Sequence, residues 1–141
     1  MKKLMVLCTG NSCRSQIAHG YFQQLSGNYL KVYSAGVETH GVNPRAIQVM
    51  KEDGVDISKN SSNNIAEYDD ILFDFIISVC DSAKERCPVF PGKSLHLHYS
   101  FSDPASATGT EAQILESFRA VRDEIKAYVS GFIKQYFSDI D

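Results

Sequence analysis

The sequence has little of what defines the more specialised classes of protein. It contains only 4 Pro and 9 Gly in 141 residues, which excludes a collagen-like, low-complexity or disordered chain. Lys and Arg total 14 against 17 Asp and Glu, so the basic excess that is typical of nucleic-acid-binding proteins is missing. No apolar run approaches the roughly 18 residues that a membrane span requires. We therefore expect an ordinary globular chain that folds as a single domain over residues 1–141.

Cysteine is also scarce. The four cysteines form two pairs along the chain, Cys8 with Cys13 and Cys80 with Cys87. They are too few for a secreted disulfide scaffold, and the apolar stretch before Cys8 is too short for a signal peptide. We therefore expect a cytoplasmic protein. In a reducing compartment such pairs indicate metal, nucleophile or redox chemistry, whereas a single cysteine is often only a small core hydrophobe.

Strand-like and helix-like segments alternate along the chain. Apolar runs of strand type occupy residues 3–7, 30–35, 75–79 and 94–98. Apolar residues at helical spacing run from Arg14 to Gly27, from Pro44 to Gly54, and over about seven turns that follow Thr110. This alternation predicts an α/β fold whose four-stranded parallel sheet carries helices on both faces.

The segment with the strongest chemical signal lies between the first strand and the first helix. It has the form Cys-x5-Arg-Ser and consists of Cys8, Thr9, Gly10, Asn11, Ser12, Cys13, Arg14 and Ser15. Backbone N–H groups in such a turn converge at the positive end of the helix and form a nest for an anion. We expect the glycine to allow the unusual backbone angles of the turn. The planar guanidinium of Arg14 can bind two oxygens of a tetrahedral oxyanion.

Cys8 stands at the mouth of this predicted nest. The helix dipole and Arg14 favour the thiolate over the thiol, and the Ser15 hydroxyl can donate to the sulfur. A thiolate that faces a bound oxyanion is a nucleophile in position to attack. The residues alone thus predict an oxyanion-binding enzyme with a cysteine nucleophile.

These residues resemble the low-molecular-weight tyrosine phosphatases and, more closely, their thioredoxin-coupled arsenate reductase branch. The resemblance covers essentially the whole chain, in the loop from Cys8 to Gln16, Tyr33–Gly36, His40–Pro44, Cys80 to Pro88, Asp103–Ala105 and Arg119 to Ile125. It implies the fold of that family, with the flavodoxin-like strand order 2-1-3-4. The phosphatases usually have an aromatic residue after the Asp-Pro pair and lack the late cysteine pair. This chain has Ala105 there, and it has both late cysteines.

The resemblance further implies a reaction and its residues. Cys8 attacks the arsenic of arsenate, and Asp103 protonates the departing oxygen. Cys80 then attacks Cys8, which releases arsenite, and Cys87 attacks Cys80 in turn. Thioredoxin reduces the final Cys80–Cys87 disulfide. No metal or organic cofactor is required. Because the predicted nest recognises tetrahedral geometry and charge, we expect phosphate and sulfate to compete with arsenate, and we expect the protein to be a monomer.

Several other interpretations stay open at this point. A phosphotyrosine phosphatase that works through a Cys8 phosphoenzyme is the main alternative, and an oxyanion-responsive redox sensor is a second. Asp103 before Pro104 could simply start a turn. His96 and His98 could belong to a zinc site, but the cysteine spacings suit structural zinc poorly, which favours the polar face of an edge strand.

Three further residues bear on the family comparison. Some family members support an alkali cation near the loop with acidic side chains. His19 and Asn63 stand at the corresponding positions of this chain, so we do not expect a cation site. Cys13 is not needed for a three-thiol relay, which favours a packing role for it.

Overall fold

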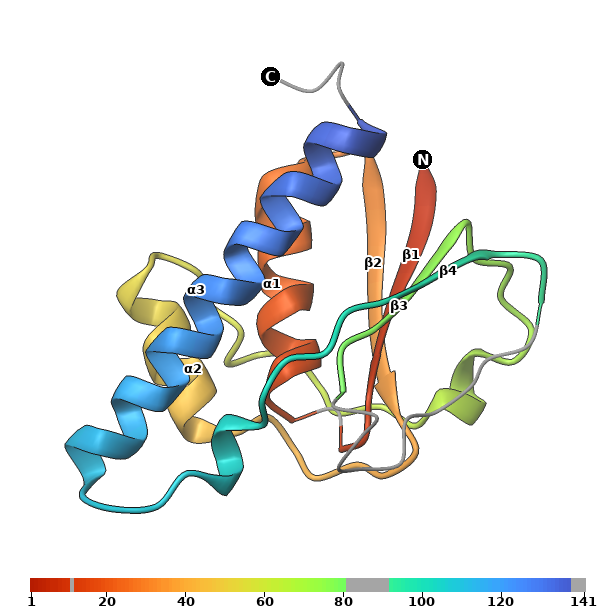
Figure 1. Ribbon diagram of the computed structural model, residues 1–141. Coiled ribbons are helices and arrows are strands. Elements are labelled where there is room, and N and C mark those ends of the chain that lie inside the picture. Colours follow the sequence, from red (N-terminus) through yellow and green to blue (C-terminus); the bar gives the residue numbers. More distant parts are fainter. Residues whose placement is uncertain (11, 81–91, 138–141) are drawn as a thin grey trace.

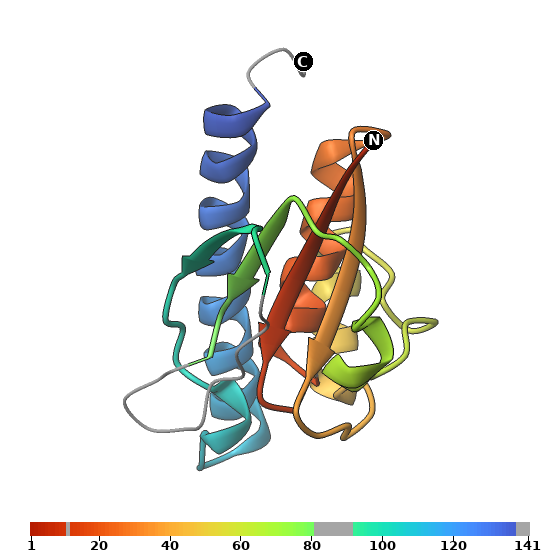
Figure 2. The ribbon, with the colours of Figure 1, turned by 90° about the vertical axis from the view of Figure 1, so that its right-hand side faces the viewer.

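A sheet of four parallel strands forms the centre of the protein, which we describe from a computed structural model. The structure describes residues 1–10, 12–80 and 92–137. The strands are β1 (Lys2–Cys8), β2 (Leu30–Gly36), β3 (Phe75–Ser78) and β4 (Leu95–His98). They pair in the order β2-β1-β3-β4, and Figure 2 shows the strands next to one another in front of the helices. The predicted order 2-1-3-4 is confirmed, and each strand boundary lies within one residue of the expected one.

Local sequence sets the ends of the three α-helices, α1 (Arg14–Ser26), α2 (Pro44–Glu52) and α3 (Glu111–Tyr136). The Asn43 side chain accepts a hydrogen bond from the Arg45 amide at the start of α2, and Thr110 forms the predicted capping box with Gln113 before α3. No helix in the described ranges is long and apolar enough to cross a membrane.

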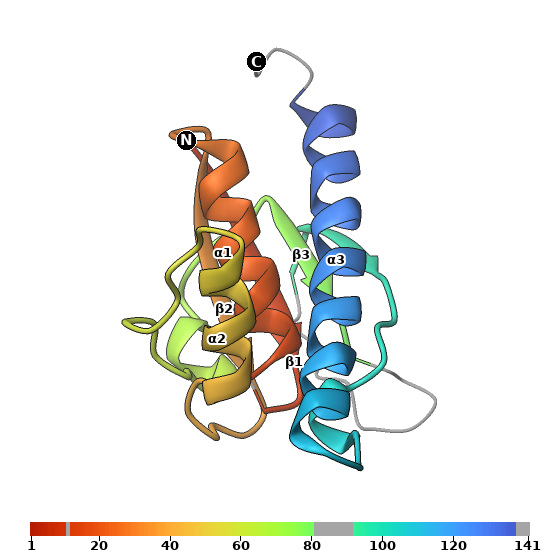
Figure 3. The same ribbon diagram turned by 90° about the vertical axis from the view of Figure 1, so that its left-hand side faces the viewer.

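The two faces of the sheet are covered differently. Alternate residues of β1 point to opposite faces, so Leu4 and Val6 belong to one apolar cluster and Met5 and Leu7 to the other. Within the described residues the α-helices all pack on the first face, as Figure 3 shows: α1 and α3 lie side by side, with Phe132 of α3 against Phe75 of β3, and α2 packs on both helices. The second face carries the 3-10 helix η1 (Ile65–Tyr68), on the right of Figure 1. The sequence did not predict η1, because a single short turn has no apolar period.

The fourth strand is less buried than its sequence pattern suggested. His96 and His98 are exposed, as expected for an edge strand, but Leu95 is exposed as well and Leu97 is only partly buried. His98 Nδ1 lies 2.6 Å from the Ser78 hydroxyl of the neighbouring strand. Within the described residues no group of three or more His, Cys, Asp and Glu could hold a metal ion.

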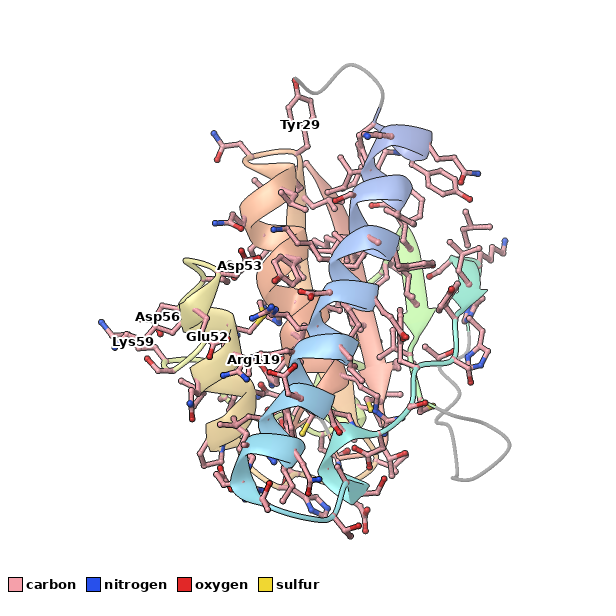
Figure 4. All side chains as sticks on the ribbon, turned by 60° about the vertical axis from the view of Figure 1, so that its left-hand side comes forward. Tyr29, Glu52, Asp53, Asp56, Lys59 and Arg119 are labelled. Atoms are coloured by element: carbon pink, nitrogen blue, oxygen red, sulfur yellow. The ribbon has the colours of Figure 1, made fainter. Side chains whose placement is uncertain are left out.

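Ion pairs join α2 to α3 on the outside of the helical layer. Glu52 accepts two hydrogen bonds from Arg119, at 3.0 and 2.8 Å, and these two side chains face each other in Figure 4. Asp53 accepts from Lys126 at 2.8 Å and from the Tyr21 hydroxyl of α1 at 2.7 Å. Lys126 and Tyr21 hold the pKa of Asp53 below its usual value. These contacts fix α2 relative to both other helices.

Two glycines inside helices make a matched test of this packing. A Cβ added to Gly20 of α1 would lie 2.9 Å from Ile57 Cγ2 and 3.1 Å from Val55 Cγ1, whereas a Cβ on Gly131 of α3 would meet nothing within 4 Å. We expect Gly20→Ala to lower the free energy of unfolding by about 1–3 kcal/mol through overpacking, despite better helix propensity. Gly131→Ala is expected to raise it by about 0.5–1 kcal/mol. Urea denaturation measures both, and equal effects of the two changes would contradict this account.

Candidate active site

The predicted oxyanion loop connects β1 to α1 at the carboxyl edge of the sheet, at the bottom of Figure 1. Cys8 is the last residue of β1 and is buried, and Arg14 is the first residue of α1. Cys13 is the N-cap residue of α1, and its side chain forms no capping hydrogen bond. No capping side chain therefore competes with an anion for the first amides of this helix.

The carbonyl groups of the loop are held by other parts of the chain. The Thr9 carbonyl accepts from the Glu38 amide at 3.0 Å, and the Ser12 carbonyl accepts from the Asn43 amide at 3.1 Å. In a trans peptide the C=O and N–H groups point in opposite directions. Bonding these carbonyls to the segment after β2 therefore turns the amides of the same peptides away from that segment and toward the nest.

The pocket above the loop has a volume of about 630 Å³. The lining residues come from the loop, from the segment after β2 and from the segment before α3, and they are Cys8, Thr9, Gly10, Ser12, Cys13, Arg14, Glu38, His40, Val42, Asn43, Pro44, Ser102, Asp103, Ala105 and Ser106. Ser15 is buried in the first turn of α1 and does not line the pocket. The sequence did not single out Glu38, Ser102 or Ser106, because no local pattern marks residues that reach a site only through tertiary contact.

Arg14 is almost fully buried, with 3% of its surface exposed. Its guanidinium is held by the segment before α3. Its Nη1 donates to the Phe101 carbonyl at 3.1 Å, and its Nη2 lies 3.8 Å from Asp103 Oδ2. A buried guanidinium held in this way keeps its planar fork in one orientation beside the nest. The structure thus brings Cys8, Arg14 and Asp103 into one pocket.

Asp103 starts a turn, as one of the two interpretations of the sequence held, and it also lines the pocket. It starts the 3-10 helix η2 (Pro104–Ser106), where its Oδ1 accepts from the Ala105 amide at 3.0 Å. Its other oxygen, Oδ2, faces Arg14. The turn therefore orients the carboxyl group toward Arg14 and the pocket.

Gly10 does not have the positive φ that glycine alone adopts easily. It is absent from the glycines with positive φ in the described residues, so the unusual backbone angle we expected does not occur there. The His40 ring lies against it instead, and a Cβ on Gly10 would meet His40 Cδ2 at 3.2 Å. The prediction of its backbone was wrong, and a larger residue here would displace the exposed His40 ring by a few tenths of an ångström.

Cys13 differs sharply from Cys8 in its expected reactivity. Burial, with a smaller effect of Asp103, raises the pKa of the Cys13 thiol to about 12. A thiol with such a pKa stays protonated at neutral pH and is a poor nucleophile. This fits the packing role that the sequence favoured for it.

Cys80 leaves the sheet beside Cys8. It is buried and follows β3, which pairs in parallel with β1 so that Leu7 lies opposite Ser78. The Val79 amide continues this pairing with a hydrogen bond to the Leu7 carbonyl at 2.9 Å. Neighbouring strands of a sheet lie about 5 Å apart. Cys8 and Cys80 therefore lie at the same edge of the sheet, at the ends of two adjacent strands.

The oxidation states of the cysteines also differ. Cys80 is disulfide-bonded, whereas Cys8 and Cys13 are thiols. Two residues of the predicted site, Asn11 of the loop and Cys87 of the late pair, lie outside the described residues.

The two positions that we compared with a cation site have other partners. His19 Nδ1 lies 2.8 Å from the Ser34 hydroxyl, and burial lowers the pKa of His19 to about 4. Asn63 accepts from the Ser61 hydroxyl at 2.8 Å and donates to Glu67 at 3.1 Å. A neutral imidazole therefore occupies the place for which the family comparison suggested an acidic group.

Fold and loop together define the class of this protein: an α/β protein with a Cys-x5-Arg-Ser loop between its first strand and first helix. The model of the low molecular weight phosphotyrosine protein phosphatase family matches residues 3–139, and the chain belongs to this family.

Within this family, the chain is similar to individual proteins named arsenate reductase. An arsenate reductase of Bacillus subtilis is 48% identical over 126 residues, which cover 88% of this chain and 89% of the relative. One of Halalkalibacterium halodurans is 44% identical over 131 residues, or 93% and 94% of the two chains. A solved structure described as an arsenate reductase in the phosphate binding state matches the full length of both chains, with a TM-score of 0.81 and 34% identity. This chain is therefore similar to arsenate reductases in sequence and in structure.

Proposed function

We propose that this protein reduces arsenate to arsenite and so serves in arsenic detoxification. The observation that carries the proposal is a pocket that combines the Cys8 thiol with the buried Arg14, while Cys80 follows the neighbouring strand. The relatives named arsenate reductase, at 44–48% identity, support the same substrate. Reduction of As(V) to As(III) takes two electrons, and oxidation of one pair of thiols to a disulfide supplies two.

In the proposed first step the Cys8 thiolate attacks arsenic. A bond forms between sulfur and arsenic, an arsenic–oxygen bond breaks, and the oxygen leaves as water after it receives a proton from Asp103. The loop amides and Arg14 bind the remaining oxygens, and Thr9, Gly10, Asn11, Ser12 and Cys13 complete the proposed binding site. Ser15, which does not line the pocket, would contribute its hydroxyl to the Cys8 sulfur.

In the second step the Cys80 thiolate attacks the Cys8 sulfur. The electron pair of the sulfur–arsenic bond stays on arsenic, arsenite leaves, and a Cys8–Cys80 disulfide remains. Cys87 then attacks Cys80, which frees Cys8 for another cycle.

Thioredoxin is the proposed reductant of the final Cys80–Cys87 disulfide. The protein is proposed to act as a cytoplasmic monomer without a metal or organic cofactor. A third thiol allows the oxidised bond to move out of the anion pocket to a place that another protein can reach.

Phosphotyrosine phosphatase activity is the second candidate, because the family model is named for it. The residues that line the pocket make phosphotyrosine hydrolysis less suitable as the main activity. Ala105 lines the pocket where the phosphatases usually have an aromatic residue, so the wall that would stack on a phenyl ring is missing at this position.

One assay separates these functions. With arsenate, thioredoxin, thioredoxin reductase and NADPH, we expect one NADPH to be oxidised for each arsenite formed. Cys87→Ser should form about one arsenite per enzyme molecule and then stop at the Cys8–Cys80 disulfide, whereas Cys13→Ser should sustain turnover.

The same variants test the alternative. Hydrolysis of para-nitrophenyl phosphate should require Cys8 and tolerate Cys80→Ser. Sustained arsenate turnover by Cys87→Ser would refute the relay. Phosphate ester hydrolysis without any arsenate reduction by the parent protein would replace the proposed function with the phosphatase.

A further inference from the structure

A loop far from the nucleophile in sequence contacts the oxyanion loop directly. The Ser62 hydroxyl donates a hydrogen bond of 3.1 Å to the Gly10 carbonyl, across 52 residues of chain. The same carbonyl accepts from the His40 amide at 3.3 Å. The Gly10 carbonyl is thus held by donors from two separate segments.

The segment that carries Ser62 is anchored on both sides of it. The Ser61 carbonyl accepts from Nε2 of Gln16, a fully buried residue in the first turn of α1, at 3.1 Å. The Asn63 carbonyl accepts from the Gly36 amide at the end of β2 at 3.0 Å. These two hydrogen bonds fix the backbone on both sides of Ser62. A residue that positions a binding site must itself be held in this way.

The direction of the Gly10 carbonyl matters for anion binding. A carbonyl oxygen that turned toward the pocket would place a partial negative charge beside the bound oxyanion and the Cys8 thiolate. Glycine rotates more easily than other residues, so its peptide needs external partners to stay in one orientation. A carbonyl that is held outward keeps the nest complementary to an anion before the anion arrives.

We propose that Ser62 is a positioning residue of the oxyanion loop, which sets its affinity for tetrahedral oxyanions by holding the Gly10 carbonyl out of the pocket. This rests on the proposed function only in so far as the loop binds an oxyanion. A purely structural role for Ser62 predicts a different result, since it would change stability without changing anion affinity.

The test measures how well inorganic phosphate protects Cys8 from alkylation by iodoacetamide, together with the pH dependence of that alkylation. In Ser62→Ala the dissociation constant of phosphate is expected to rise about 3- to 10-fold, the effect of one neutral hydrogen bond. The apparent pKa of Cys8 should rise as well, and the KM for arsenate should increase more than kcat falls. Ser62→Thr, which keeps the hydroxyl, should bind phosphate like the parent.

The neighbouring serine provides a matched control. The Ser61 hydroxyl is exposed and donates to Asn63 Oδ1, not to the oxyanion loop. Ser61→Ala should therefore leave phosphate protection within about twofold of the parent. Unchanged protection in Ser62→Ala, an equal loss in Ser61→Ala, or a Thr variant as weak as the Ala variant would each overturn the proposal.

Phosphate protection does not depend on arsenate turnover. If the parent protein fails to reduce arsenate while Ser62→Ala still weakens phosphate protection, the proposed reaction fails and the positioning role stands. If Ser62→Ala reduces arsenate and binds phosphate as the parent does, the reaction stands and the positioning role fails.

Discussion

Replacement of Arg14 by lysine should weaken the binding of arsenate and of phosphate by at least about 100-fold. Lysine keeps the positive charge but has no planar fork, so the second hydrogen bond to the oxyanion is lost and the first is misplaced. Each hydrogen bond to a charged group contributes about 1.5–3 kcal/mol. The lysine would also leave the Phe101 carbonyl, which now accepts from Arg14 Nη1 at 3.1 Å, without its present donor. Protection of Cys8 from alkylation and the KM for arsenate measure the loss.

A second arginine near the pocket controls for the change of residue type. Arg45 lies beside the lining residue Pro44, but its guanidinium pairs with Glu111 at 2.8 Å on the exposed surface. Arg45→Lys should therefore change phosphate binding by less than about twofold, because exposed ion pairs contribute little. If Arg14→Lys folds and binds phosphate as tightly as the parent, the oxyanion does not bind where we place it.

The second large effect concerns stability at mildly acidic pH. Burial lowers the pKa of His19 to about 4, from 6.5 for a histidine in an unfolded chain. The unfolded chain therefore takes up a proton as pH falls through 6.5, whereas the folded protein resists it until about pH 4. The stabilisation is present in full above pH 6.5, falls with pH, and is gone below pH 4. We expect a loss of about 2 kcal/mol between pH 7 and 5, and about 3 kcal/mol in all.

His19→Asn tests this assignment. An Asn side chain can still form the hydrogen bond to the Ser34 hydroxyl, but it does not titrate. The variant should have a flatter dependence of unfolding free energy on pH between 7 and 5, measured by urea denaturation, whatever its absolute stability. His96→Asn, on the exposed face of β4, should keep the slope of the parent. An unchanged slope in His19→Asn would show that another group causes the pH dependence.

Local sequence was sufficient for the part of the site that lies within one turn. Cys8 and Arg14 are only six residues apart, at the end of a strand and the start of a helix. The spacing of apolar residues predicts both of these elements. The short connection forces the thiol and the guanidinium to the same edge of the sheet in any fold that keeps these two elements. Helix ends followed from side chains with local hydrogen bonds, such as those of Asn43 and Thr110.

Tertiary structure alone determined which distant residues contact the loop and Arg14. Nothing in the sequence around Ser62 indicates that its hydroxyl reaches the Gly10 carbonyl. No local pattern predicts that the His40 ring lies beside Gly10. Asp103 lies 89 residues beyond Arg14, and only the η2 turn brings its carboxylate to 3.8 Å from the guanidinium. Such contacts depend on strand register and on how loops pack at the sheet edge, and they carry no apolar period along the chain. The sequence therefore determined the nucleophile and its loop, while packing between distant segments determined which groups orient them.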